Sequence, residues 1–206
     1  MAKIKWKGGA LLAPVPPVMV SCGDMENSNI ITVGWTGIIN TIPPKTYISV
    51  RKSRHSYELI KNSGEFVINL TPTNLVREAD FCGIYTGKKV NKFEKCKLTK
   101  GEAQNVSCPI IEESPLSIEC KVFDIIELGT HDMFLADIVG VDVSEDIIGN
   151  DGKLRLDKAN LTAYAHGEYF ELGKKIGTFG FSTAKKKKKS HPATQKSGNS
   201  NKKTVK

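Results

Sequence analysis

The densest group of chemically active side chains in this chain lies in residues 51–57. Within seven residues it brings together two arginines, two serines, a histidine and a tyrosine, where a strand is predicted to end and a helix to begin. A helix N-terminus presents free N–H groups to an anion, and an arginine can bind two phosphate oxygens at once. The segment therefore predicts a phosphate site, unless a serine only caps the helix and the arginines are solvated. Its members are Arg51, Ser53, Arg54, His55, Ser56 and Tyr57.

A second candidate binding surface lies just before this group. Residues 30–36 form an apolar run rich in β-branched side chains, and residues 47–51 form another after a Pro-Pro turn. A flat ring needs an apolar surface, and glycine lets backbone N–H groups approach its edge closely. With the phosphate site, these runs predict a ligand with a planar ring and a phosphate; the alternative is that Trp35 belongs to the core. The residues concerned are Thr32, Trp35, Thr36, Gly37, Ser49 and Val50.

His131 is the candidate for proton chemistry. It lies in a Gly-Thr-His-Asp turn between predicted strands at residues 116–128 and 133–143. An imidazole titrates near neutral pH and can donate a proton or a hydrogen bond, and Asp132 is placed to orient it. The alternative is a turn histidine that only bonds to the backbone.

A polar face is predicted late in the chain. Residues 161–169 have the composition of a strand, and strand alternation puts Tyr164, His166 and Glu168 on the same side. Such a face either lines a site or faces water.

These candidates must be positioned by a mainly β fold. Strands outnumber helices, no βαβ alternation occurs and no Gly-x-Gly-x-x-Gly motif is present, which argues against a dinucleotide-binding α/β fold. Many short antiparallel strands favour a barrel or a sandwich. Strands are predicted at residues 18–22, 30–36, 47–51, 66–70, 116–128, 133–143 and 161–169, and helices at 56–62 and 75–81, with a helical turn near 90–93.

Several of these segments resemble the flavin reductase-like family, FMN-binding split β-barrels that include the flavoredoxins. Asn29, Thr32 and Trp35 match an Asn-x-x-Thr-x-x-Trp-like strand of that family, and the Gly-Thr-His turn resembles its turn near the flavin. Lys92 and Phe93 match a family segment near the pocket where substrate would bind, although from the residues alone we expect the lysines of this segment to lie in a solvated loop. The resemblance implies cofactor contacts from Asn29, Thr32, Trp35, Thr36, Gly37, Ser49, Val50, Arg51, Ser53, Arg54, His55, Ser56, Tyr57, Tyr164 and His166, and a catalytic role for His131.

The resemblance also implies a function. We expect an antiparallel split barrel, a homodimer, that binds FMN and uses NAD(P)H to reduce flavin or a small acceptor. The alternative is a flavoredoxin-type carrier that exchanges electrons with a redox partner protein. A nucleic-acid-binding β-barrel is a third possibility, but no basic and aromatic strand face supports it.

The positive charge is concentrated at the C-terminus. The chain carries 30 basic and 22 acidic residues, and nine of the lysines lie beyond residue 184, so the rest has 21 against 22. We therefore expect one domain over residues 1–182 and a disordered Lys-rich tail over 183–206. The tail either aids solubility or makes loose contacts with nucleic acid or an anionic membrane.

The cysteines and the apolar N-terminal segment point to a cytoplasmic protein. The five cysteines include no Cys-x-x-Cys pair, so we expect no metal site and free thiols, as in a reducing compartment. Residues 10–20 are apolar but contain three prolines and lack the length of a membrane span, so no membrane association is expected.

Overall fold

The computed structural model describes residues 1–183. By its contacts the chain divides into a unit of Met1–Leu172 and a unit from residue 173 onward. Within the second unit, residues 173–183 form only turns and irregular backbone. The predicted Lys-rich tail lies, apart from residue 183, outside the described residues.

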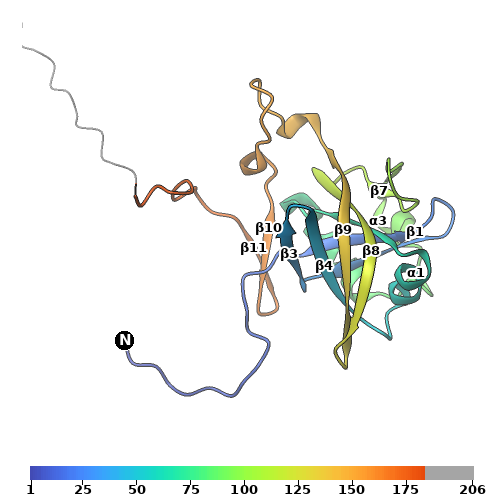
Figure 1. Cartoon of the computed structure of the whole chain (residues 1–206), viewed down its shortest axis with the longest axis horizontal. Helices are drawn as coiled ribbons and strands as arrows, with labels where there is room; N and C mark the ends of the chain where they lie inside the picture. Colours follow the sequence, from blue (N-terminus) through green and yellow to red (C-terminus); the bar gives the residue numbers. More distant parts are fainter. Residues whose placement is uncertain (184–206) are drawn as a thin grey trace, which may run out of the picture. The chain divides into compact units, whose positions relative to one another are not determined.

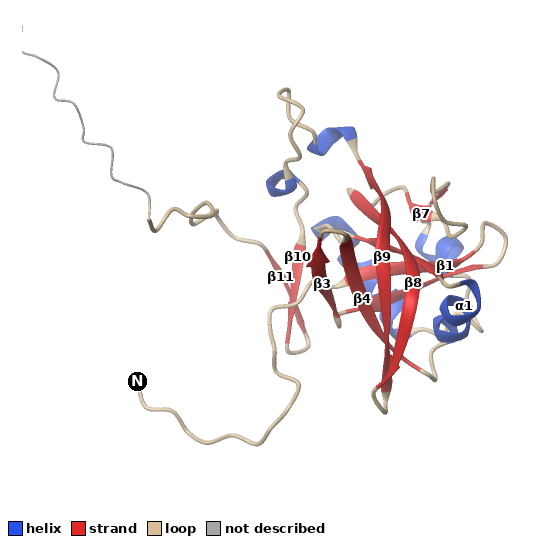
Figure 2. Ribbon diagram, viewed as in Figure 1, coloured by secondary structure: helices blue, strands red, loops and turns tan. Residues whose placement is uncertain are grey.

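One seven-stranded antiparallel sheet forms the body of the first unit (Figures 1 and 2). The order of its strands is β2-β1-β5-β8-β9-β4-β3. The two longest strands pair along most of their length. The strands are β1 (Val18–Gly23), β2 (Ser28–Val33), β3 (Thr36–Thr41), β4 (Pro44–Arg51), β5 (Glu65–Asn69), β8 (Leu116–Glu127) and β9 (His131–Val143).

The sheet curls into a barrel, as its connectivity requires. Strands β2 and β3 are the two edges of the sheet, yet only Gly34 and Trp35 separate them in the chain. The edges must therefore approach each other at this two-residue link. The Ser49 N–H of β4 donates to the Trp35 carbonyl at 2.9 Å, which extends the β3–β4 pairing up to the link. The prediction of a mainly β, antiparallel split barrel is confirmed.

Short helices and two small hairpins complete the unit. Helix α1 ends where predicted, because Gly64 adopts the left-handed conformation that closes a helix. No helix among residues 1–183 is long and apolar enough to cross a membrane. The elements are α1 (His55–Ser63), α2 (Val76–Ile84), α3 (Lys92–Cys96), the hairpins β6 (Lys100–Gly101) with β7 (Ile110–Ile111) and β10 (Thr162–Ala165) with β11 (Glu168–Glu171), and the 3-10 turns Thr73–Leu75, Glu145–Ile147 and Leu156–Lys158.

The predicted strand boundaries were wrong in two places. The run at residues 30–36 is broken after Val33, and a separate strand, β3, begins at Thr36. The run at residues 161–169 is a hairpin that turns at His166–Gly167, where both φ angles are positive. Because the chain reverses there, the predicted shared face of Tyr164, His166 and Glu168 on one strand does not exist.

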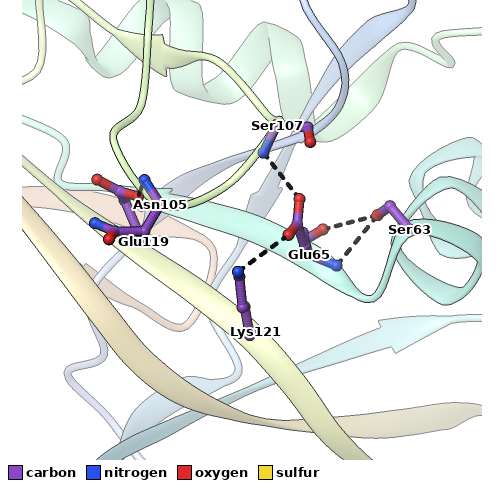
Figure 3. Close-up of polar contacts among 6 residues, drawn as sticks. All are labelled: Ser63, Glu65, Asn105, Ser107, Glu119 and Lys121. Atoms are coloured by element: carbon purple, nitrogen blue, oxygen red, sulfur yellow. Dashed lines mark hydrogen bonds and ion pairs between the residues drawn. The ribbon is translucent and has the colours of Figure 1, made fainter.

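A segment that we call the strap, residues 102–109, is held by carboxylates of strands β5 and β8 (Figure 3). Glu119, only 1% exposed, accepts the backbone N–H groups of Gln104 at 3.1 Å and Asn105 at 2.6 Å. Glu65 accepts the Ser107 N–H at 2.8 Å and lies 3.7 Å from the Lys121 ammonium. Backbone donors thus compensate these acidic groups.

Candidate functional site

Most of the predicted phosphate residues surround one cavity of about 160 Å³, which we call the cation hollow. The end of β4, the start of α1, strand β2 and the segment after α2 supply its walls. It brings together side chains that are distant in sequence, from Asn29 to Lys92. Its lining is Asn29, Ile31, Arg51, Ser53, Arg54, His55, Ser56, Cys82, Tyr85, Thr86, Gly87 and Lys92.

The N-terminus of α1 opens this hollow to an anion. Arg54 occupies the N-cap position, and no side chain caps the first turn. The Ser56 hydroxyl instead accepts a hydrogen bond from the Asn29 amide at 2.7 Å. The alternative in which a serine only caps the helix is therefore not observed, and the helix dipole remains available to a ligand.

Lys92 is buried at the hollow, so the expectation of a solvated loop lysine was wrong for this residue. Its side chain lies on α3 and is only 3% exposed. The ammonium donates to the Ile30 carbonyl at 2.6 Å and the Cys82 carbonyl at 2.8 Å, which joins β2 to α2. Burial lowers the pKa of Lys92, and the nearby Arg54 lowers it further.

The cations of the hollow have no acidic counterpart. Among residues 1–183, no carboxylate forms an ion pair with Arg51, Arg54 or Lys92. Burial, followed by the charges of Lys88 and Lys92, lowers the pKa of His55. Positive charges gathered without carboxylates make this a site for an anion, and a phosphate fits the donors present.

Gly87 completes the wall through a close backbone approach. A Cβ atom on this residue would lie 2.2 Å from Asn29 Oδ1 and 2.7 Å from His55 Cδ2. Any other residue at this position would require the side chains of Asn29 and His55 to move. Tyr85, Thr86 and Gly87 also line the hollow but were not predicted from the sequence; the glycine just before the matched segment at Lys92 was the available signal.

Two further hollows of about 130 and 430 Å³ adjoin the cation hollow, with Arg51 and Arg54 in the lining of all three. Trp35 is 39% exposed and lines both, so it is not a core residue. Thr32 also lines both, and its hydroxyl donates to the Ala79 carbonyl. The smaller hollow is lined by Ile31, Thr32, Val33, Gly34, Trp35, Ser49, Val50, Arg51, Arg54 and His131, and the larger, the wide hollow, by Pro17, Thr32, Gly34, Trp35, Arg51, Arg54, Asp80, Gly83, Ile84, His131, Tyr164 and Tyr169.

His131 lies opposite Arg51 at the start of β9 and faces both adjoining hollows. The Arg51 Nε–H donates to His131 Nε2 at 3.4 Å, and Nδ1 lies 3.0 Å from the Thr130 hydroxyl. Burial lowers the pKa of His131, and Arg51 and Arg54 lower it further. The imidazole is therefore neutral at pH 7, and its contact with Arg51 fits the tautomer with hydrogen on Nδ1.

Asp132 does not orient His131, contrary to our expectation. Its side chain is fully buried and accepts a hydrogen bond from the Tyr57 hydroxyl at 2.6 Å. Lys52 lies 3.4 Å from the same carboxylate. The bond to Asp132, followed by burial, raises the pKa of Tyr57 to about 12. Tyr57 thus joins α1 to β9 and does not line the cation hollow.

Three other predicted contacts also lie outside the hollows. Thr36 donates to the Tyr47 carbonyl at 2.6 Å, and Gly37 packs against the Tyr47 ring. Phe93 is buried in a cluster with Met19 and belongs to the core. Neighbouring sequence positions are therefore separated in space, because alternate strand residues and opposite helix faces point in different directions.

The β10–β11 hairpin also contributes side chains to the hollows. Tyr164 lines the wide hollow and also a fourth cavity of about 380 Å³, the apolar hollow. His166 lines only the apolar hollow. Tyr169, which we did not predict, lines the wide hollow and donates to Asp80 at 3.2 Å. No group of three or more His, Cys, Asp or Glu side chains in residues 1–183 is arranged to hold a metal ion.

Comparisons with known proteins place this site within a family. The structure is similar to flavoredoxin of Desulfovibrio vulgaris (Miyazaki F), with a TM-score of 0.82 and 30% identity over 89% of this chain and 100% of that one. It is also similar to flavoredoxin from Methanosarcina acetivorans, with a TM-score of 0.81 and 25% identity over 89% and 100% of the two chains.

A relative named for its activity is the FMN reductase (NADH) RutF of Pseudomonas syringae pv. syringae. It is 22% identical over 48% of this chain and 53% of its own length. The model of the protein family described as "Flavin reductase like domain" matches residues 11–173. This chain belongs to the flavin reductase-like family of split β-barrels.

Proposed function

We propose that this protein binds FMN, with the phosphate in the cation hollow and the ring in the adjoining hollows. The observation that carries the proposal is the set of Arg51, Arg54 and Lys92, cations without carboxylate partners beside the uncapped start of α1. The close approach of Gly87 closes the wall around that position. When bound, FMN would supply the redox chemistry, since its ring accepts and releases electrons.

The side chains of this chain would hold and orient the cofactor. Arg51 and Arg54 can bind phosphate oxygens through their forked donors, and Lys92 adds positive charge while it fixes two walls of the hollow. Trp35 and Thr32 form the sides of the ring end. His131, neutral and held by Arg51 and Thr130, can offer or exchange a proton at the open face.

The activity that we infer is NAD(P)H-dependent reduction of flavin or a small acceptor. The wide hollow supports this proposal because His131 and Arg51 line a space of about 430 Å³ that exceeds the needs of a phosphate. The similarity to an NADH-dependent FMN reductase supports it further.

A second candidate is a flavoredoxin-type electron carrier that serves a redox partner protein. The likeness to two flavoredoxins over the whole length of those chains favours it. We also propose that the protein is a homodimer, since the large apolar side chains of Ile38, Ile42 and Val141 are exposed on β3, the following turn and β9. The free thiols of the five cysteines support a cytoplasmic location. Gel filtration with light scattering tests the dimer, and a monomer at micromolar concentration would refute it.

Two measurements test these proposals. The purified protein should be yellow and absorb near ~450 nm from bound flavin; absence of flavin, even after incubation with FMN, would refute the cofactor. Anaerobic mixing with NADH and with NADPH then separates the two functions. Rapid bleaching supports the reductase. If neither nicotinamide bleaches the flavin but a low-potential chemical donor does, the result supports the function of electron carrier.

A further inference from the structure

The apolar hollow gives a role to the apolar N-terminal segment. Residues 10–13 and Val15 form one wall, and Trp35 and the turn at His166–Gly167 form the other. The segment is fixed there by two backbone hydrogen bonds between Val15 and Tyr164, at 2.9 and 2.8 Å. Figure 1 shows the segment running beside the β10–β11 hairpin before it enters β1. This apolar stretch thus forms one wall of a cavity.

The chemistry of this cavity is opposite to that of the cation hollow. No Lys, Arg, Asp or Glu lines it, and Tyr164 and His166 are its only ionisable groups. A charged molecule would lose hydration there without gaining a counter-ion, which is costly. The volume of about 380 Å³ lies in the range of small-molecule pockets. A small, uncharged, apolar molecule therefore fits this cavity better than a charged one.

The position of the cavity links it to the redox site. Trp35 and Tyr164 line both the apolar hollow and the wide hollow, where His131 and Arg51 are found. A molecule in the apolar hollow would therefore contact two aromatic side chains that also line the ring end of the proposed FMN site.

We propose that the apolar hollow binds the electron acceptor, and that this acceptor is an uncharged planar ring compound of the quinone class. The inference rests on the proposed function. The overall reaction takes a hydride from NAD(P)H and a proton from solvent to convert the quinone to the hydroquinone, leaving NAD(P)⁺. Two electrons and two hydrogens are therefore transferred, and no other reactant is needed.

A binding measurement on the flavin-free protein tests the site independently of catalysis. The chain has two tryptophans, and Trp6→Phe leaves Trp35 as the only one, at the wall of the apolar hollow. Titration with 2-methyl-1,4-naphthoquinone should quench the Trp35 fluorescence saturably. Leu11→Asp should weaken this binding about tenfold or more, because it puts a charge into an apolar pocket. The control is Leu154→Asp, a leucine of similar exposure, 45% against 52%, that lines none of these hollows.

The acceptor role is tested by reoxidation of chemically reduced, FMN-loaded protein under anaerobic conditions. Leu11→Asp should slow reoxidation by the naphthoquinone about tenfold and leave reoxidation by ferricyanide, a polyanion, unchanged. Equal rates for wild type and variant with the quinone would overturn the proposal, as would equal slowing with both oxidants. Loss of the native oligomer in Leu11→Asp would also overturn it, because the segment would then be a subunit contact. Failure to bind FMN refutes the proposed function, while the fluorescence titration still decides on the pocket.

Discussion

The cation hollow and the strap differ in how far the fold itself compensates their charged side chains. At the strap, Glu119 and Glu65 receive hydrogen bonds from backbone N–H groups, so their charge is compensated within the fold. At the hollow, Arg51 and Arg54 have no carboxylate partner among the described residues. Lys92 also lacks a carboxylate partner, although its ammonium donates to two backbone carbonyls. Compensated charge serves the structure, whereas uncompensated charge of one sign indicates a site that a ligand completes. Substitutions in the two regions should therefore have separable effects.

The largest effect is expected at the open face of the wide hollow. His131→Asn should retain FMN but slow bleaching by NAD(P)H by about 10²–10⁴-fold, the usual cost of losing a positioned acid or donor. Anaerobic stopped-flow absorbance measures this rate. His166→Asn is the control, because asparagine also tolerates the left-handed turn at that position. If His131→Asn bleaches at the wild-type rate, His131 is only a turn residue.

The next effect concerns the buried cation. Lys92→Met should weaken FMN binding by about 1.5–3 kcal/mol, the value typical of hydrogen bonds to charged groups, and should also lower stability because two carbonyls lose their donor. Fluorescence titration and thermal unfolding measure the two changes. Lys95→Met, an exposed lysine on the same helix, should change neither. Unchanged FMN affinity in Lys92→Met would remove this residue from the site.

A substitution in the strap should affect the stability of the fold and not the binding of FMN. In Glu119→Gln an amide replaces one carboxylate oxygen and faces a backbone donor, which should lower the free energy of unfolding by about 1–3 kcal/mol. FMN affinity should not change. Urea denaturation and fluorescence titration measure both quantities, with the exposed Glu26→Gln as the control. Parallel losses of stability and affinity would show that the two regions are coupled and would break the comparison.

The smallest effect is a shift in pH dependence. Burial, Arg51 and Arg54 lower the pKa of His131 below its ordinary value of about 6.5. If neutral His131 is the active form, turnover is full above this pKa and is lost as the pH falls through it. Arg51→Ala removes one of the causes, so the acid limb of the rate profile should move to higher pH. A shift to lower pH, or none, would contradict this electrostatic account.

Much of the fold could be predicted because local signals agreed with it. The alternating runs gave the strands, and Gly64 marked the end of α1. The break at Gly34–Trp35 was missed because β-forming residues stand on both sides of it, and a single glycine such as Gly34 can also lie within a strand. Only the curling of the whole sheet requires the two edges to meet at that point.

The site was predictable in part for the same reason. Arg51 and Arg54 lie in one segment, so sequence proximity identified them. Lys92 resembled the exposed lysines near it, and its burial depends on the Ile30 and Cys82 carbonyls, which only the folded chain brings together. Tyr57 was in the correct segment but on the helix face that meets Asp132.

The central claim is that the uncompensated cations of the hollow bind the phosphate of FMN. Titration of the flavin-free protein with FMN and with riboflavin, which lacks only the phosphate, tests it most directly. Wild type should prefer FMN, and Arg51→Ala should reduce FMN affinity by about 1.5–3 kcal/mol, as for a charge-assisted hydrogen bond, while riboflavin affinity changes little. Equal affinity of the wild type for the two ligands, or an equal loss for both in Arg51→Ala, would contradict the claim.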